Sequence, residues 1–419
     1  MTDQITENAK AILLLCGRFS ASEQDAVFPL SVKEYDDVAT WLQSKSWWPS
    51  DLLKEENLAA LNDAFAPIQS DRIKALLARG AAMALAIEKW TNKGLWVLCR
   101  SDQDYPQCLK RHLKGNAPPI LYGAGERELL SKGGLAVVGS RNIDADGQSF
   151  ARELGECAAE AGMQLVSGAA RGVDETAMHG AFSAGGSVVG VVADSLLRSA
   201  VSGKYREGIR DGQLVLVSTY NPEAGFNVGN AMGRNKYIYA LADYAVVVSA
   251  DYRQGGTWAG AEEELKREGG RPVFVRTGAH MPKGNSELIK LGGLPFPSDS
   301  VKGNLKEALR AACADTSKPV AVAETTATYV QPESHKQPSE VRETPTTASS
   351  VFDVVRPLIL KALEKPRKLD DLAKVLQVRK PQLQDWVTLL IAEGVLEQRT
   401  IRKTKKLAIR KTGEELQLM

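Results

Sequence analysis

The sequence predicts an α/β protein with a mostly parallel sheet, a helical N-terminal domain and a C-terminal winged helix-turn-helix. Three observations predict this organisation. Apolar residues recur at helical spacing up to about residue 92, short β-branched runs alternate with helical stretches from Gly94, and the chain ends in two alternating strands. We therefore expect domains at residues 1–92, 93–313 and 351–419, with a flexible linker at 314–350.

The first domain is expected to be a small bundle of helices. Segments such as DLLKEENLAALNDAF and SDRIKALLARGAAMALAIEKW carry apolar side chains at helical spacing. Its tryptophans, Trp41, Trp47, Trp48 and Trp90, have rings that can stack on nucleobases. Because no basic run surrounds them, we interpret them as packing residues.

The second domain contains apolar runs that predict strands. The runs are LWVL, PILYG, LAVVGS, MQLVSG, SVVGVVA, QLVLVS, YAVVVSA and RPVFVR. Helical stretches or glycine-rich turns separate them. Strands that alternate with helices indicate βαβ crossovers, and hence a mostly parallel sheet with both faces covered.

Two of these strands lead through a glycine turn into a helix. The turn residues are Gly139, Ser140 and Arg141 after the first strand, and Ser167, Gly168, Arg171 and Gly172 after the second. A helix N-terminus offers free N–H groups and a positive dipole, which suit a phosphate, and both loops are expected at one sheet edge. There Arg141 and Arg171 can clamp phosphate oxygens, while Asp174 orients an arginine or caps the helix. The alternative is a pair of tight turns that need glycine only for a positive φ.

Two further glycine-rich segments repeat this arrangement. GFNVGNAMGRNK ends in Arg234, Asn235 and Lys236 before a helix, and Gly255-Gly256-Thr257 follows the strand YAVVVSA. Three donors in a row favour a ligand contact over an ordinary solvated helix terminus. We therefore expect four loops at one edge of the sheet.

These segments together resemble the DprA/Smf family of DNA-processing proteins. The strings that carry the resemblance are VVGSR, SGAARGVDETAMHGAFSAGG, GRNKYIYALADYAVVVSA and AEEELKREGGRPVFV. Upstream, residues 104–106, 117–119 and 121–123 resemble the segment that leads into the Rossmann-like domain of this family. With both terminal domains, the resemblance covers most of the chain.

The resemblance implies a protein that binds single-stranded DNA in a basic pocket, forms a homodimer and assists loading of a RecA-type recombinase, chiefly in natural transformation. The positions that match the DNA-contacting loops of the family are Gly139, Ser140, Arg141, Ser167, Gly168, Arg171, Gly172, Arg234 and Asn235. We expect further phosphate contacts from Lys236, Gly255, Gly256 and Thr257, and we expect no catalytic residue and no cofactor.

The chain departs from the family pattern in three places. Where the family has Phe-Pro-x-Arg-Asn-Arg this chain has GFNVGNAMGRNK, and Gly255-Gly256-Thr257 stands in place of Ser-Gly-Ser. VVADSLLRSAVSGKYREGIRDG replaces a short glycine and Tyr-Pro turn. These differences indicate a divergent branch.

The same departures suggest an alternative function. Gly-Gly-Thr before glutamates, with Met232 and Arg234 upstream, resembles the cytokinin-activating phosphoribohydrolases. The alternative is a nucleotide-binding sensor or a phosphoribohydrolase-like enzyme of this superfamily, acting in phage defence, with Arg234 and Glu262 as its candidates. Glu262 lies five residues after Thr257 rather than beside it, so we interpret residues 262–264 as a solvated helix face.

The last segment predicts a basic DNA-binding module. Residues 315–350 lack sustained apolar periodicity, whereas 351–363, 369–378 and 381–393 predict helices before the strands VLEQRTI and KKLAIR. Residues 351–419 carry 15 basic and 9 acidic side chains, so their excess of positive charge exceeds the net +2 of the whole chain. The candidate contacts to duplex DNA are Lys380, Arg399, Arg402, Lys403, Lys405 and Lys406. The alternative is a winged helix that contacts a protein, in a regulatory or defence adaptor.

Cysteine, histidine and N-terminal patterns set further expectations. The five cysteines form no C-x-x-C pair and the four histidines never fall at ligand spacing with them, so we expect no disulfide framework, no metal and a cytoplasmic protein. The N-terminus is acidic where a signal peptide is basic, and its apolar run from Ala11 to Cys16 is too short to span a bilayer. We expect no membrane association.

Overall fold

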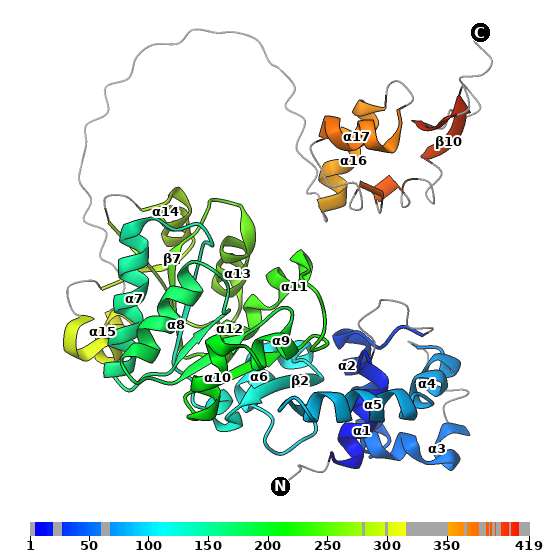
Figure 1. The fold of residues 1–419 in the computed structure, drawn as a ribbon, viewed down its shortest axis with the longest axis horizontal. Coiled ribbons are helices and arrows are strands. Elements are labelled where there is room, and N and C mark those ends of the chain that lie inside the picture. Colours follow the sequence, from blue (N-terminus) through cyan, green and yellow to red (C-terminus); the bar gives the residue numbers. More distant parts are fainter. Residues whose placement is uncertain are drawn as a thin grey trace, which may run out of the picture. The chain divides into compact units, whose positions relative to one another are not determined.

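The computed structural model describes most of the chain before residue 316 and parts of the remainder (Figure 1). The described residues are 5–19, 27–59, 68–278, 281–297, 301–315, 351–363, 367–376, 383–384, 386–387, 390, 395–401 and 404–409. The chain forms two compact units, Met1–Val322 and Ala323–Met419. The domain boundaries at residues 92 and 313 stay predictions, and the linker 314–350 lies outside the described residues after residue 315.

The N-terminal helices are short, and side chains cap the first two of them. They are α1 Glu7–Cys16, α2 Val32–Ser44, η1 Pro49–Leu53, α3 Glu55–Ala59, α4 Ser70–Leu77 and α5 Gly80–Thr91. Ser31 caps α2 in a reciprocal capping box with Glu34. The apolar pattern over residues 70–90 forms two helices, α4 and α5, rather than one, because the chain leaves helical geometry at Arg79.

The tryptophans of this region divide into packed and exposed residues. Trp90 is buried, as expected of a packing residue, and Trp47 packs edge to face on Trp41 with 5.6 Å between the ring centroids. Trp48, in contrast, is 65% exposed, so its interpretation as a packing residue is wrong. It caps η1, and the inward position of this turn is already occupied by Trp47.

The central sheet has nine strands in the order β1-β2-β6-β5-β4-β3-β7-β8-β9. The strands are β1 Trp96–Cys99, β2 Ile120–Gly125, β3 Leu135–Gly139, β4 Leu165–Ser167, β5 Val188–Val191, β6 Leu214–Ser218, β7 Tyr244–Ser249, β8 Val273–Val275 and β9 Leu294–Pro295. The pairs β1–β2 and β2–β6 are antiparallel and all the other pairs are parallel. The eight predicted strands and the mostly parallel sheet are therefore confirmed, and β9 is an addition.

The strand order places a topological switch point at β3. From β3 the chain proceeds outward through β4, β5 and β6 and then returns to add β7 on the other side of β3. Adjacent loops at such a point run in opposite directions and leave a crevice beyond the carboxyl ends of the strands. Residues that follow β3 and β7 are therefore brought to one place.

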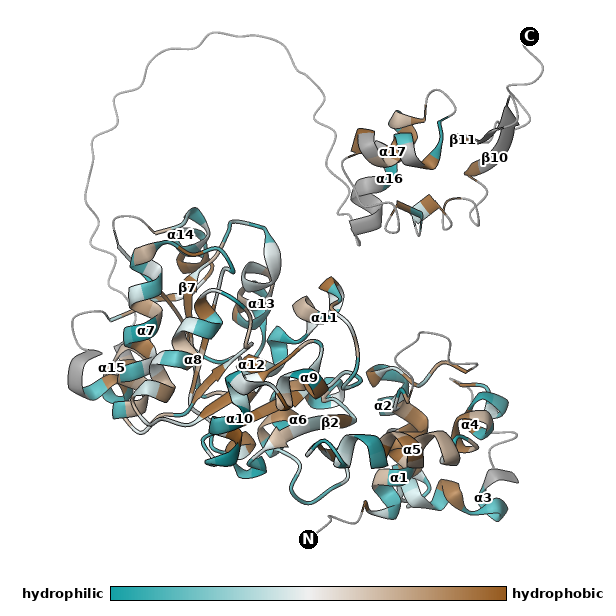
Figure 2. Ribbon diagram, in the orientation of Figure 1, coloured by the Kyte–Doolittle hydropathy of each residue, from teal (hydrophilic) through white to brown (hydrophobic). Residues whose placement is uncertain are grey.

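Helices cover both faces of the sheet. They are α6 Gln107–Leu113, η3 Lys114–Asn116, η4 Arg127–Ser131, α7 Ala145–Glu160, α8 Val173–Ser183, α9 Leu196–Ala200, α10 Gly203–Arg210, α11 Val228–Gly233, α12 Asn235–Leu241, α13 Gly255–Lys266, α14 Lys283–Lys290 and α15 Val301–Asp315. Alternate residues of β3 enter different cores: Val137 packs with α7 and α8, and Val138 with α12 and α13. Figure 2 shows strands of the central sheet, such as β7, in the brown of hydrophobic residues.

The C-terminal unit contains two described helices and one hairpin. They are α16 Val351–Ala362, α17 Leu369–Leu376, β10 Leu396–Ile401 and β11 Thr404–Ile409. Leu383, Val387 and Leu390, from the third predicted helix, are buried in a small core with these elements. The rest of that helix lies largely outside the described residues, so the complete winged helix stays a prediction.

Two further properties concern the chain as a whole. All five cysteines are free thiols. Across the described ranges, no helix is both long enough and apolar enough to cross a bilayer.

Candidate nucleic-acid site

A cavity of about 370 Å³ opens beyond the carboxyl ends of β3 and β7. We call it the central cavity. Its lining comes from the β3–α7 loop, the β4–α8 loop, residues 226–235 and the start of α13, so the four segments expected at one sheet edge do meet. Of the predicted site residues, those that line it are Gly139, Ser140, Arg141, Arg234, Asn235, Gly255, Gly256 and Thr257.

The other predicted residues do not line this cavity. Ser167 is buried, and its hydroxyl donates to the carbonyl oxygen of Val137 at 2.7 Å. Arg171 is exposed, so Arg234 rather than Arg171 accompanies Arg141 at the cavity. Lys236 is half-buried over the ring of Tyr237, 5.1 Å from its centroid. Gly168 and Gly172 lie in the backbone behind the lining.

The wall of the cavity contains a buried ion pair. Arg234 is 6% exposed and Asp174 is 5% exposed, and Arg234 Nη2 lies 3.4 Å from Asp174 Oδ2. Burial raises the pKa of Asp174 and lowers that of Arg234, and each partner opposes the shift of the other. The expectation that Asp174 orients an arginine is confirmed.

This pair leaves part of the arginine unsatisfied. Nε and Nη1 of Arg234 have no hydrogen-bond partner within the described part of the chain. A buried polar atom without a partner costs about 1–3 kcal/mol, and more when the group is charged. An anion in the central cavity would accept from these nitrogens, so Arg234 is oriented as a donor for a ligand.

Two glycines make room for this arrangement. A Cβ at Gly168 would overlap the guanidinium of Arg234, so only glycine lets that side chain cross the β4–α8 loop. Gly172 has a φ of +95° and lies against the carbonyl oxygens of Ser140 and Arg141, which joins the first two loops. These residues therefore shape the site without facing the ligand.

The N-terminus of α13 supplies backbone donors. Gln254 caps this 12-residue helix, and Gly255 adopts a φ of +74°. The Asn235 Nδ2 donates to the carbonyl oxygen of Gly256 at 2.8 Å, which fixes the loop against α12. The first N–H groups of an α-helix have no intrahelical acceptor, so this turn presents free donors beside Arg234.

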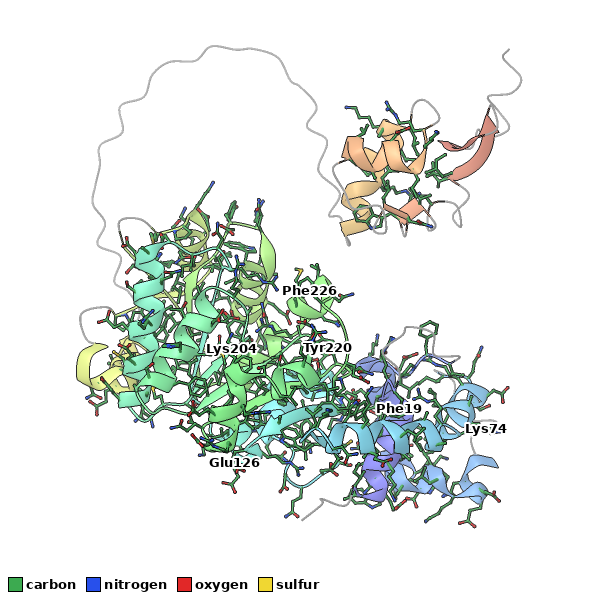
Figure 3. The ribbon with its side chains drawn as sticks, in the orientation of Figure 1. Phe19, Lys74, Glu126, Lys204, Tyr220 and Phe226 are labelled. Atoms are coloured by element: carbon green, nitrogen blue, oxygen red, sulfur yellow. The ribbon has the colours of Figure 1, made fainter. Side chains whose placement is uncertain are left out.

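The mouth of the central cavity is aromatic and cationic. The Arg141 guanidinium lies over the ring of Phe226, 5.0 Å from its centroid. Phe226, Val228 and Met232 are exposed large apolar side chains, and Figure 3 labels Phe226 beside α11. The sequence analysis missed α11, because Gly229 and Gly233 weaken its helical pattern. The capping signal of Asn227, which accepts from the N–H of Asn230, could have located its start.

The glutamates considered for the alternative enzyme function make contacts outside the central cavity. Glu262 accepts from Trp258 Nε1 at 2.9 Å and from Lys266 Nζ at 2.8 Å, and it does not line the central cavity. Glu264 is 2% exposed and lies 2.9 Å from His112 Nε2, so its interpretation as part of a solvated face is wrong. Only Glu262 and Glu263 remain on the outer side of α13. No group of three potential metal ligands gathers among the described residues.

For the basic hairpin formed by β10 and β11, the structure describes how the two strands pair. Arg399 of β10 pairs in register with Lys406 of β11, and Thr400 pairs with Lys405. Lys380, Arg402 and Lys403 lie outside the described residues. The DNA contacts assigned to these positions remain predictions.

Comparison with known proteins identifies related chains. The family model described as DNA recombination-mediator protein A matches residues 96–297. The DNA processing protein DprA of Bacillus subtilis is 25% identical over 243 residues, which cover 56% of this chain and 78% of that protein. The putative DNA processing protein DprA of Mycobacterium tuberculosis is 32% identical over 154 residues, which cover 35% of this chain and 40% of that protein.

A solved structure agrees with this relationship at the level of the fold. DNA processing protein A from Streptococcus pneumoniae superposes with a TM-score of 0.54 at 21% identity, and the match covers 69% of this chain and 94% of that chain. The matched region 96–297 includes every loop that lines the central cavity. The chain is therefore a distant member of the DprA/Smf family of DNA-processing proteins.

Proposed function

We propose that this protein binds single-stranded DNA in the central cavity and delivers it to a RecA-type recombinase. One observation carries the proposal: four loops converge on a cavity in which Arg234 is buried with two unsatisfied guanidinium nitrogens. Membership of a DNA-processing family makes a nucleic-acid phosphate the natural anion for this site.

The lining suits both parts of a nucleotide. Arg234 and the first turn of α13 offer donors to phosphate oxygens, and Arg141 can add a second guanidinium at the mouth. The exposed ring of Phe226 offers a face on which a base can stack. A single strand exposes its bases to such a ring, whereas a duplex keeps them stacked inside, so the arrangement favours single-stranded DNA.

The test is fluorescence anisotropy of a labelled single strand titrated with the full-length protein across a salt series. Arg141→Glu is expected to weaken binding at least tenfold and to reduce the slope of log K against log salt. Arg152→Glu is the matched control, because Arg152 is an exposed arginine of α7 outside the cavity. Equal losses in the two variants would indicate a general charge effect and overturn the proposal.

Arg171→Glu refines the same experiment. The family resemblance assigns Arg171 to DNA, yet its side chain is exposed and does not line the cavity. A loss as large as that of Arg141→Glu would extend the DNA path over the β4–α8 loop. An unchanged affinity would confine the path to Arg141, Arg234 and α13.

The C-terminal unit is proposed to be a winged helix with a DNA-contacting hairpin. The hairpin register and the small helical core support this assignment. Charge reversal at Lys405 and Lys406 is expected to weaken duplex binding and to leave single-strand binding unchanged. If single-strand binding is lost instead, the hairpin rather than the central cavity holds the strand.

Recombinase loading and dimerisation are the remaining parts of the proposal. The family description as a recombination mediator supports the first, and the resemblance of the loops supports both. Strand exchange by a RecA-type recombinase on single strands coated with single-strand-binding protein is expected to accelerate with the wild-type chain and not with Arg141→Glu. Sedimentation at several concentrations tests the homodimer, and a monomer at all of them would exclude it.

A further inference from the structure

A second cavity, of about 630 Å³, lies between α2 and residues 100–115. We call it the Trp48 cavity. The charged and aromatic residues that line it are Tyr35, Asp36, Trp47, Trp48, Arg100, Lys110 and Lys114, and Ser101 is among the polar ones. None of these residues lines the central cavity.

One wall of the Trp48 cavity is an exposed indole. Trp48 is 65% exposed and makes no ring contact with another aromatic residue in the described part of the chain. Its backbone N–H donates to Asp51 Oδ2 at 2.8 Å. Trp47, which packs on Trp41, also lines the cavity. An exposed tryptophan beside a cavity is suited to stacking on a planar ligand.

The opposite wall is positively charged. Arg100 is already committed, because its Nη2 lies 3.0 Å from Asp36 Oδ1 and its guanidinium lies over the ring of Tyr35. Lys110 Nζ lies over the ring of Tyr105, 5.3 Å from its centroid. Among the described residues, neither Lys110 nor Lys114 has a carboxylate partner at ion-pair distance. Burial and the nearby Arg100 lower the pKa of Lys110, so an anion beside this ammonium group would stabilise its charged form.

A buried hydroxyl adds a hydrogen-bonding group. Ser101 Oγ is buried and has no hydrogen-bond partner within the described ranges. It lines the same cavity as the two lysines. The Trp48 cavity therefore combines an aromatic face, two lysines without a carboxylate partner and one unsatisfied polar atom, and these groups suit a nucleotide.

A third cavity, of about 460 Å³, is lined by segments that neighbour those of the other two. Gly225 and Asn227 line it, while the alternate residues Phe226 and Val228 line the central cavity, so one strip of chain separates the two. At its other end it is lined by Ser31 and Val32, at the start of the helix that forms the Trp48 cavity. Residues close together in the chain therefore line the third cavity and each of the other two.

We propose that the Trp48 cavity binds a second nucleotide of the same single DNA strand, with its base stacked on Trp48 and its phosphate held by Lys110 and Lys114. This inference rests on the proposed function, since it adds a second contact to the strand held in the central cavity. A strand too short to reach from one cavity to the other cannot use both contacts. The affinity for single strands should therefore increase with length beyond what the central cavity alone provides.

The experiment compares oligothymidylates from about 4 to about 30 nucleotides, a range that spans the site sizes of known single-strand binders. Trp48→Ala is expected to weaken binding of the longest strands about tenfold and to leave the shortest unchanged. Trp48→Phe, which keeps a stacking ring, should restore most of the loss. Leu85→Ala is the matched control, because Leu85 is 70% exposed and lies outside all three cavities.

A second pair of variants tests the cationic wall without altering the indole. The double variant Lys110→Gln with Lys114→Gln is expected to weaken binding of the longest strands at low salt. It should also reduce the slope of log K against log salt by about two. Lys93→Gln is the control, because Lys93 is an exposed lysine outside the cavity. These variants also decide the question if Trp48→Ala fails to fold.

The outcomes separate the inference from the proposed function. If the wild-type chain binds no single strand, the proposed function fails. If the wild type binds and the variants at Trp48, Lys110 and Lys114 match it at every length, the inference alone is overturned. If Trp48→Ala instead weakens binding of thymidine monophosphate and of short strands equally, the cavity holds a free nucleotide and the second strand contact is excluded.

Discussion

The central cavity and the Trp48 cavity both offer cations and an aromatic ring, but the groups are buried to different degrees in the two sites. In the central cavity the cation is Arg234, which is buried, paired with Asp174 and surrounded by backbone donors. In the Trp48 cavity the cations are lysines without a carboxylate partner among the described residues, and the indole of Trp48 is largely exposed. The first site is part of the core of the protein, whereas the second lies between α2 and residues 100–115 with its aromatic ring open to solvent.

The difference predicts which changes affect folding and which affect only binding. A buried ion pair is coupled to stability, because removing one partner leaves an uncompensated charge in a medium of low polarity. An exposed ring and two lysines outside any buried ion pair are coupled to stability much more weakly. Substitutions should therefore lower the stability of the chain at the central cavity and leave it nearly unchanged at the Trp48 cavity.

The largest expected effect is on stability. Asp174→Asn should lower the free energy of unfolding by about 3 kcal/mol, because it removes the charge that pairs with the buried Arg234. Urea denaturation at neutral pH measures this loss. A second variant, Asp174→Asn with Arg234→Met, removes both charges and should recover most of it. A single variant as stable as the wild type would show that the pair is not coupled to folding.

The next effect is on affinity. Gly168→Ala places a methyl group where the Arg234 guanidinium lies, so the arginine must move away from the cavity. Loss of one charged hydrogen bond corresponds to a decrease of about tenfold to a hundredfold in affinity for single-stranded DNA. Gly203→Ala is the comparison variant, because Gly203 lies outside the site, has open space where a Cβ would stand and does not adopt a positive φ. If Gly168→Ala binds DNA normally, Arg234 does not contact it.

A smaller effect is expected at the mouth of the central cavity. Arg141→Gln keeps a polar side chain over Phe226 but removes the charge. Affinity for single strands should decrease about fivefold at low salt, and the salt slope should decrease by about one. Stability should remain unchanged, because Arg141 is exposed. A lower melting temperature with unchanged affinity would show that Arg141 contributes to stability rather than to DNA binding, which is the opposite of the expected difference from Arg234.

The helix that carries the Trp48 cavity has its own pH dependence. The Arg72 guanidinium, 2.5 Å from Glu34 Oε1, lowers the pKa of Glu34 from 4.5 to about 2. A carboxylate with a depressed folded pKa stabilises the protein above its unfolded pKa, and this stabilisation is lost as the pH falls from about 5 to about 2. Glu34→Gln should cost about 1 kcal/mol at pH 7, after allowance for solvent screening, and less at pH 3. A pH-independent cost would indicate that only the capping hydrogen bonds matter.

The smallest expected effect completes the comparison. Trp48→Ala should change the free energy of unfolding by no more than about 0.5 kcal/mol, because the ring is exposed. Thermal unfolding checks this value. A loss of several kcal/mol would mean that Trp48 is a packing residue after all and would weaken the case for a ligand at its face.

Much of the α/β region could be predicted because its residues carry strong local signals. Most of the eight strands are short apolar runs buried on both faces, so their sequences indicate a strand whichever strand they pair with. The four loops could be assigned to one edge because the carboxyl ends of parallel strands meet there. The helix α11 and the two-residue β9 escaped prediction, because glycines weaken the first pattern and the second is too short to show one.

The site was less predictable because it depends on side-chain directions. Arg171 and Arg234 both follow glycines and precede helices, yet only Arg234 lines the central cavity. Glu264 continues a row of glutamates, but His112, far away in sequence, draws it into the core. Trp47 and Trp48 are adjacent and chemically identical, and one packs while the other is exposed.

The sequence by itself determined the order of strands and helices, the glycine loops that end at one sheet edge and the family to which the chain belongs. These properties are local, since hydrophobic periodicity and the conformational freedom of glycine act within a few residues. Only the tertiary structure decided which arginine is buried against Asp174, which glutamate meets a histidine and which tryptophan borders a cavity. Each of these outcomes is a competition for the interior between residues far apart in the chain, and packing decides it.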